Sequence, residues 1–344
     1  MDLHPVADDA NRMRHEGGQG HYEVWYVTLS HLASRTGFWI RYTLEAPQAG
    51  HGEPYAQLWF ARFDPARPER TFGINKKVPY ASLTAKTGPF GIAIDGSVAD
   101  SGSMRGGFEG GGHKVSWDLR WPPSTRVHRH LPTWAYRGTW ADTQVLSPSV
   151  NSAADGEIIV DGERYELKGT PVGQTHLWGK KHAYSWGWSH CNAFEGESPR
   201  TALETLSVRL RRGSVVLPTL TMLALHLDGE EPIRFAEPWQ LPFCKSSYGT
   251  GRYELKCADA FRKVEATFTC RPEDMLMAEY VDPDGDPAYC HNTECADLTV
   301  VLWRRSAVVS RWRLDRTLTA KRTAHYEWGA RAGDPLVRKR HQAV

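Results

Sequence analysis

The sequence lacks any run of apolar residues long enough to cross a membrane. A membrane-spanning helix needs roughly 20 consecutive apolar residues, and no stretch of the 344 residues approaches that length. The first 20 residues are polar and lack the apolar centre of a secretory signal, so we expect a soluble, cytoplasmic protein without a transmembrane segment. We interpret residues 1–17 as a flexible leader.

The sequence also has little net charge and few cysteines. The 42 Lys and Arg nearly balance the 40 Asp and Glu, without long runs of one sign, so we expect no nucleic-acid partner. The basic cluster VRKRH at 337–341 lies in a short tail, residues 334–344, and is interpreted as a solvated end. The six cysteines all lie in the second half, and without a secretory signal we expect reduced thiols.

Fingerprints of cofactors and metals are missing as well. The Gly-rich segment 103–117 lacks the helix and the Lys-Ser/Thr pair of a phosphate-binding loop, so we expect a turn between strands. His176, His182 and His190 do not have the spacing of a zinc motif, and no metal site is predicted. The segment CHNTEC at 290–295 is expected to be a loop with free cysteines. An enzyme built on this sequence is therefore expected to work without a cofactor.

The segments between the 21 Pro and 31 Gly residues have the pattern of β-strands. They alternate and are rich in aromatic and β-branched residues. The expected strands are 21–32, 37–46, 54–63, 297–305 and 323–331, whereas 207–217 is expected to form a hairpin and 251–270 two strands. Asp-Gly pairs at 95–96, 161–162 and 228–229 predict tight hairpins between apolar runs. Because there are too many strands for one small barrel, the sequence predicts an all-β fold with two domains, residues 18–200 and 201–333.

Residues 183–194 have an unusual alternation of large and small side chains. The even positions are Tyr184, Trp186, Trp188, His190, Asn192 and Phe194, and the odd positions carry Ala, Ser, Gly and Cys. Successive strand side chains point to opposite faces, and a half-buried strand alternates apolar with charged residues. Here both faces are expected to be covered. A single strand of twelve residues would span about 40 Å, so a break near Gly187 is also considered.

With Trp178-Gly179 before it, this segment resembles the central signature of the tocopherol cyclase and hydroxyneurosporene synthase (carotenoid 1,2-hydratase) superfamily. That signature is a Trp-Gly pair, a Trp-x-Trp, a polar residue and an aromatic one. Residues 37–44, 56–64, 114–121 and 323–331 resemble other strands of the family. The resemblance covers residues 20–331 and implies two tandem lipocalin-like (calycin) antiparallel β-barrels.

The resemblance leaves the function open, because the family includes carotenoid hydratases, tocopherol cyclases and pericyclases. Leu177 stands where the hydratases carry an acid. This departure disfavours alkene hydration and leaves cyclisation or simple binding open.

A lipocalin-like barrel encloses a cavity for an apolar ligand, and tandem barrels add a cleft between them. Aromatic walls suit a polyene or a prenylated ring, since each ring stabilises a developing cation by roughly 0.5–2 kcal/mol. The expected substrate-binding residues are Trp178, Trp186, Trp188, Asn192, Phe194 and Trp59.

The expected proton donor to a heteroatom is His190, helped by His176 or Tyr184. An alkene requires a carboxylic acid that burial keeps neutral. The candidates for that acid are Glu23, Glu204 and Glu327.

Each of these residues also has a structural interpretation. Trp186 and Trp188 can fill a barrel core, His190 can be a buried histidine bonded to a backbone carbonyl, and Trp178 can anchor a turn. Strand glutamates are most often exposed.

Three functions follow from the sequence. The first is a cofactor-independent cyclase, isomerase, pericyclase or hydratase acting on a hydrophobic isoprenoid- or polyketide-like small molecule. The second is a lipocalin-type lipid carrier without catalysis. The third is a Trp-rich glycan-binding or glycan-cleaving domain with an open aromatic platform. The sequence does not fix the oligomeric state.

Overall fold

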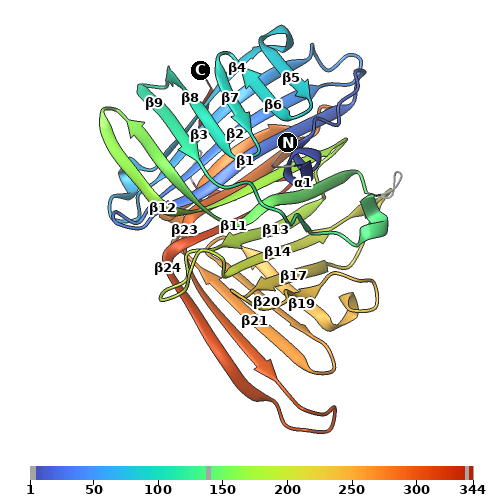
Figure 1. Ribbon diagram of the computed structural model, residues 1–344. Coiled ribbons are helices and arrows are strands. Elements are labelled where there is room, and N and C mark those ends of the chain that lie inside the picture. The colour runs from blue at the N-terminus through green and yellow to red at the C-terminus, as the bar shows by residue number, and fades with distance from the viewer. Residues whose placement is uncertain (1–4, 137–140, 338–340, 344) are drawn as a thin grey trace.

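The computed structural model describes residues 5–136, 141–337 and 341–343, and nearly all of its regular structure is β-strand (Figure 1). Within these residues, one sheet has 13 strands and a second has 10. The strands of the first sheet are β1 (His21–His31), β2 (Thr36–Ala46), β3 (Tyr55–Phe63), β4 (Phe72–Pro79), β5 (Leu83–Thr87), β6 (Phe90–Ile94), β7 (Ser97–Asp100), β8 (Ser103–Gly110), β9 (His113–Arg120), β10 (His128–Arg129), β11 (Thr143–Val160), β12 (Glu163–Gly179) and β25 (His341–Ala343).

The second sheet follows in the chain. Its strands are β13 (Ser185–Cys191), β14 (Ala202–Arg209), β17 (Leu220–His226), β18 (Ile233–Phe235), β19 (Cys244–Gly249), β20 (Arg252–Ala258), β21 (Arg262–Thr269), β22 (Leu276–Val281), β23 (Pro287–Arg304) and β24 (Arg313–Ala330). A separate two-stranded hairpin joins β15 (Arg211–Arg212) to β16 (Val215–Val216). The helical elements are α1 (Pro5–Asn11) and the 3-10 helices η1 (Pro68–Arg70), η2 (Tyr80–Ser82), η3 (Thr133–Tyr136), η4 (Leu241–Phe243) and η5 (Pro272–Asp274).

Each sheet curls into a nearly closed barrel, the first in the upper half of Figure 1 and the second in the lower half. All pairings in both sheets are antiparallel except that of β25, which pairs parallel with β4. The prediction of an all-β fold with two antiparallel barrels is confirmed. The chain leaves the first sheet at Gly179 and enters the second at Ser185, ahead of the division at residue 200 that the sequence favours.

Three apolar clusters hold the molecule together, one inside each barrel and one between them. Every residue of β2 is buried, because one face of this strand fills the first barrel and the other packs against the second. Strands β1, β2 and β3 contact β23, and β1 also contacts β24. The burial of both faces explains why these strands lack the apolar–charged alternation of a solvated sheet.

Part of the segment 1–17, which the sequence suggested as a flexible leader, is helical in the described structure. Residues 5–11 form helix α1, and its Ala7, Ala10 and Asn11 are buried. The Asn11 side chain donates to the Oε1 of Gln174, and its backbone oxygen accepts the indole N–H of Trp25. These bonds tie α1 to the first barrel. Among the described residues, no helix has the length and apolar character that a membrane crossing requires.

The other end of the chain also returns to the first barrel. Val337 is buried in the core of the second barrel, and β25 pairs with β4 of the first, so part of the tail is not the solvated end expected from the sequence. Residues 338–340 of the basic cluster lie outside the described residues.

The cysteines differ from the sequence-based expectation in two ways. Cys244 and Cys257 face each other across β19 and β20 and form a disulfide, whereas reduced thiols were predicted. Residues 290–295 lie inside β23 rather than in a loop, with Cys290 and Cys295 buried. Their alternating pattern in a long paired strand explains this placement.

Candidate functional site

A cavity of about 650 Å³ lies between the two barrels. Strands β1, β2 and β12 of the first barrel line one side, and β13, β14, β22 and β24 of the second line the other. Its aromatic lining residues are Tyr22, Tyr26, Trp39, Trp134, Tyr184, Trp186, Trp188 and Tyr280. Burial raises the pKa of Tyr26 and Tyr280 well above the ordinary value, so these phenols stay protonated hydrogen-bond donors.

Strand β13 supplies the two tryptophans of the signature to this cavity. It runs from Ser185 to Cys191 without a break at Gly187 and pairs with β14 and β24 along its length. Trp186 and Trp188 face the first barrel, whereas a methyl group on Gly187 would lie 2.9 Å from the ring of Tyr248 inside the second. The small residues of β13 therefore leave room for side chains inside the second barrel, and its large residues form one wall of the cavity.

His182, in the loop between β12 and β13, is held by a buried carboxylate at the cavity wall. Its Nδ1 lies 2.6 Å from the Oδ1 of Asp282, and its backbone N–H donates to the same oxygen. Arg331 pairs with the other oxygen of Asp282 at 2.5 Å. Burial by itself would raise the pKa of Asp282, but the bonds from His182 and Arg331 lower it, so the carboxylate is ionised.

The imidazole of His182 is also fixed by aromatic stacking. It stacks on Tyr22, Tyr280 and Trp186 at centroid distances of 4.6, 5.3 and 5.4 Å. Because Asp282 accepts from Nδ1–H, Nε2 is the ring nitrogen of His182 that this bond leaves for proton exchange. A histidine oriented in this way suits general acid–base chemistry.

A second polar group, Glu327 on β24, contacts the edge of the Trp186 ring. The indole Nε1–H of Trp186 donates to Glu327 over 2.9 Å. Behind Glu327, His325 lies 3.6 Å from its Oε2 and bonds the buried Glu294 at 2.5 Å.

The neighbouring side chains of Glu294, His325 and Glu327 determine the charge at the cavity. Burial opposes charge on His325, but Glu294 and Glu327 outweigh it and raise the pKa of His325 to about 9. Burial likewise would raise the pKa of Glu327, but His325 and Trp186 lower it. Glu327 therefore faces the cavity as a carboxylate, suited to accept a proton or to stabilise positive charge.

Arg41 on β2 contributes a buried cation to the same cavity. Its guanidinium lies over the rings of Tyr280, Trp59 and Trp39 at 4.4, 5.4 and 5.6 Å, and its Nε donates to Thr43.

Glu23 and His176, both predicted to be catalytic, lie together but away from the cavity, on the faces of β1 and β12 that point into the first barrel. His176 bridges the Oε1 of Glu23 at 2.8 Å and the backbone oxygen of Ala10 at 2.7 Å. Glu23 also accepts the backbone N–H groups of Arg14 and His15. Burial would raise the pKa of Glu23, yet the bonds from His176, His21 and these N–H groups lower it to about 2. Glu23 is an ionised anchor for the segment after α1.

His190 and Asn192 lie at a tight contact between the barrels, outside the cavity lining. His190 bonds Glu204 at 2.5 Å, and a methyl group on Gly173 would lie 2.5 Å from its Nε2. Asn192 donates to the backbone oxygens of Ser152 and Val172 in the first sheet. Both side chains are thus engaged in joining the barrels.

The remaining predicted residues are distributed around the cavity. Tyr184 lines it, with Arg211 over its ring at 5.6 Å. Trp59 lies one layer behind Arg41, and Phe194 packs in the core of the second barrel because β13 ends at Cys191. Trp178 lies beside His176, with Arg14 over its ring.

The three histidines weighed as a metal site have separate partners: Glu23, Asp282 and Glu204. Within the part of the chain that the structure describes, no three His, Cys, Asp or Glu residues are arranged to hold a metal ion.

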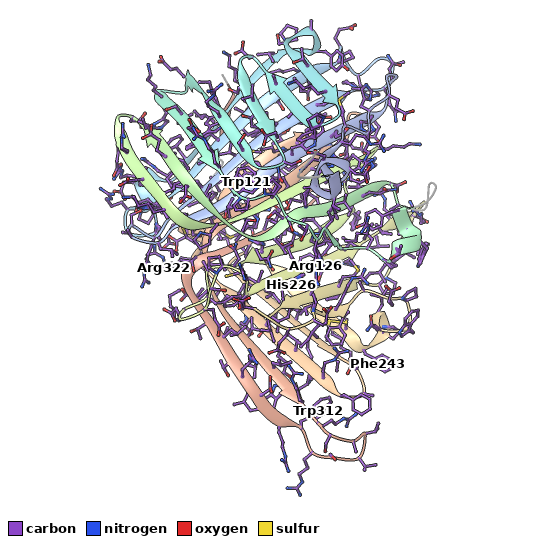
Figure 2. All side chains as sticks on the ribbon, viewed as in Figure 1. Trp121, Arg126, His226, Phe243, Trp312 and Arg322 are labelled. Atoms are coloured by element: carbon purple, nitrogen blue, oxygen red, sulfur yellow. A yellow bond between two sulfur atoms is a disulfide. The ribbon has the colours of Figure 1, made fainter. Side chains whose placement is uncertain are left out.

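A second cavity, of about 600 Å³, is polar. Its walls include Arg126 and His226, which Figure 2 places where the barrels meet, whereas Trp312 lies at the far end of the second barrel. Its charged groups pair with each other, as in Arg200–Asp228 and Arg126–Glu231.

Sequence reasoning missed the roles of Asp282, His325 and Arg41. His325 and Glu327 alternate within an aromatic strand, as Arg41 does within β2, and a charged residue in such a strand is a signal that could have identified them. Asp282 is 100 residues from His182 and carries no local signal.

Comparison with known proteins supports the resemblance seen in the sequence. Residues 94–329 match the family described as tocopherol cyclase-like. An uncharacterized protein of Mycobacterium tuberculosis, matched in two strains, is 28% identical over 315 residues, which cover 87% of this chain and 88% of the relative.

Two solved structures share the fold, and both are lipocalin-like tandem-barrel proteins. An AttH-like protein of Nitrosomonas europaea is 16% identical with a TM-score of 0.55, and the match covers 90% of this chain and 92% of that one. Kievitone hydratase from Nectria haematococca is 9% identical with a TM-score of 0.52, covering 93% and 91%.

Proposed function

Because this chain belongs to the tocopherol cyclase-like family, we propose that it is a cofactor-independent enzyme that cyclises, isomerises or hydrates a hydrophobic small molecule in the cavity between its barrels. The observation that carries the proposal is that Trp186 contacts both groups: His182 stacks on the face of its ring, and Glu327 accepts its indole N–H. An acid–base group and a carboxylate thus face one aromatic cavity.

His182 is the proposed proton donor. Its Nε2 transfers a proton to a carbonyl, hydroxyl or ether oxygen of the substrate, and Asp282 stabilises the imidazolium through Nδ1–H before that transfer. The role that the sequence suggested for His190 passes to His182, since His190 is bonded to Glu204 and packed on Gly173.

Glu327 is the proposed counter-charge and proton acceptor. Protonation of the substrate creates positive charge, which the carboxylate and the surrounding rings stabilise. Ring closure, double-bond shift or addition of water is followed by loss of one proton to Glu327 or back to His182. The sequence of steps involves no net oxidation or reduction.

The arrangement favours an enzyme over a carrier. A carrier needs only the aromatic walls, whereas burying a His–Asp pair and a charged Glu–His–Glu chain against an apolar ligand costs free energy that binding alone does not recover. The hydrophobic ligand is expected to be isoprenoid- or polyketide-like, because aromatic residues from both barrels line the cavity.

Untargeted mass spectrometry tests the proposal. Wild type, His182→Gln and His113→Gln are incubated with a lipid extract rich in isoprenoids and polyketides. His113 is the matched control, since it pairs with Asp161 at 2.8 Å outside the cavity. We expect a compound that wild type and His113→Gln consume and His182→Gln spares. A compound that all three proteins retain unchanged would indicate a carrier.

A further inference from the structure

We infer that the cavity selects hydrophobic molecules that carry an oxyanion, such as a carboxylate, and that Arg41 is the residue that binds it. This inference rests on the proposed function only in taking the cavity between the barrels as a ligand site. It adds a substrate class: an apolar body with one acidic end.

The first observation is that Arg41 is buried with most of its donors unused. The residue is 4% exposed and lines the cavity. A guanidinium has five N–H donors, and the bond from Nε to Thr43 at 2.8 Å accounts for one. Its remaining four N–H groups, on the two terminal nitrogens, have no hydrogen-bond acceptor among the described residues.

The second observation is that the nearby carboxylates are engaged elsewhere. Asp282 is bonded by His182 and Arg331, and Glu327 by Trp186 and lies beside His325. In the described part of the chain, none of these forms an ion pair with Arg41.

Glu45 is the remaining acidic neighbour. It lies on the same face of β2, two alternating positions beyond Arg41. Glu45 is buried and pairs with Tyr22 and Tyr55 on the neighbouring strands, and burial raises the pKa of its carboxyl well above the ordinary value despite the charge of Arg41. In the described part of the chain, no hydrogen bond or ion pair joins Glu45 to Arg41, whose Nε bonds Thr43 instead.

The three aromatic rings around Arg41 hold its guanidinium in place but accept no hydrogen bond from its terminal nitrogens. Tyr280, Trp59 and Trp39 cover the guanidinium, and cation–π contacts contribute little of what a buried charge loses on leaving water. The planar fork of an arginine held in this way matches the two oxygens of a carboxylate. A bound oxyanion would supply the missing partner.

Ligand binding with matched fluorescent probes tests the inference. Anilinonaphthalene sulfonate carries an oxyanion, and N-phenylnaphthylamine has nearly the same rings without charge. Each is titrated into wild type, Arg41→Met and Arg211→Met. Arg211 is the matched control because it lines the same cavity but is exposed. Competition by dodecanoate and by dodecanol repeats the comparison for a carboxylate in wild type.

We expect Arg41→Met to weaken the sulfonate probe by about tenfold or more and the neutral probe by no more than about twofold. Arg211→Met is expected to change either Kd by at most about twofold, as for an exposed charge. In wild type, dodecanoate should displace the probes at concentrations about tenfold below dodecanol.

Equal losses of the sulfonate probe in the two variants would overturn the inference, and so would equal displacement by dodecanoate and dodecanol. If Arg41→Met does not fold, as judged by circular dichroism, the competition in wild type decides alone. If both probes bind wild type and Arg41→Met with the same Kd, the role of Arg41 is contradicted, and the proposed function is unaffected. Failure of both probes to bind contradicts the cavity as a ligand site and hence both proposals.

Discussion

The indole N–H of Trp186 donates a hydrogen bond to Glu327 over 2.9 Å. The same ring stacks on His182, so one tryptophan fixes the positions of both proposed acid–base groups. Trp186 is in turn held by β13, whose small residues pack into the second barrel. The geometry of the site therefore depends on the alternation of large and small residues in this strand.

Replacing Glu327 by Gln is expected to lower kcat by about 10²-fold or more with little change in KM. The amide oxygen still accepts the Trp186 N–H, but the charge that stabilises the cationic transition state is lost. Steady-state kinetics with the identified substrate measure the effect. Glu265→Gln is the matched control, because Glu265 accepts the Trp303 indole N–H at the same 2.9 Å on the outside of the second barrel. Full activity in Glu327→Gln would remove Glu327 from the chemistry.

Replacing Asp282 by Asn is expected to lower kcat by about 10²–10⁴-fold, because the amide neither fixes the Nδ1–H tautomer of His182 nor stabilises its protonated form. KM should change little, since the aromatic walls remain. The unfolding temperature is measured alongside because Asp282 also bonds Arg331. Asp161→Asn, which alters the His113 pair, is the control and should retain full activity. An equal loss in both variants would contradict the assignment.

The lowered pKa of Glu23 predicts that the free energy of unfolding falls in acid. Its pKa falls from the ordinary 4.5 to about 2 in the folded protein. A depressed carboxyl pKa stabilises the fold above the unfolded value of 4.5, and that stabilisation, about 3 kcal/mol, is lost as the pH falls from 4.5 to 2.

We expect Glu23→Gln to lower the free energy of unfolding at pH 7 and to flatten its dependence on pH below 4.5. Chemical denaturation across this range measures both. Glu254→Gln, which removes a surface partner of Arg252, should behave like wild type. An unchanged acid profile in Glu23→Gln would show that the anchor does not contribute.

The raised pKa of His325 predicts that the free energy of unfolding falls in alkali. Burial by itself would lower its pKa, but Glu294 and Glu327 on either side outweigh burial and raise the pKa of His325 from 6.5 to about 9. A raised histidine pKa stabilises the fold fully below 6.5, and the contribution disappears as the pH rises through 9. The free energy of unfolding of wild type should therefore fall between these values. His325→Gln should lack this dependence, whereas His31→Gln, outside the chain of charges, should keep it.

The fold follows from the sequence wherever the alternation is local. Strands β1, β2 and β3 lie within one or two residues of the predicted segments, and Asp95 and Asp161 have the positive φ of tight turns, as the predicted hairpins require. Helix α1 was missed because its seven residues carry too little apolar periodicity to stand out. Its stability comes from contacts with Trp25 and His176, which are distant in the sequence.

The site follows from the sequence only in part. The pattern of β13 placed Trp186 and Trp188 on one face, but it did not reveal that His190 on the same face meets Gly173 rather than a ligand. Glu23 and His176 looked like catalytic groups because their types suit proton transfer. The register of pairing between β1 and β12 directs the side chains of Glu23 and His176 into the first barrel. No local sequence pattern predicts that register.

Single-turnover kinetics of His182→Gln and His190→Gln, compared at equal folded fractions, test the central claim most directly. With the identified substrate, the account predicts that His182→Gln binds it but converts it at least about 10²-fold more slowly. His190→Gln should convert the substrate at nearly the wild-type rate, with a lower unfolding temperature because it loses its bond to Glu204. A well-folded His190→Gln that fails to react, beside an active His182→Gln, would contradict the account and place the chemistry at the contact between the barrels.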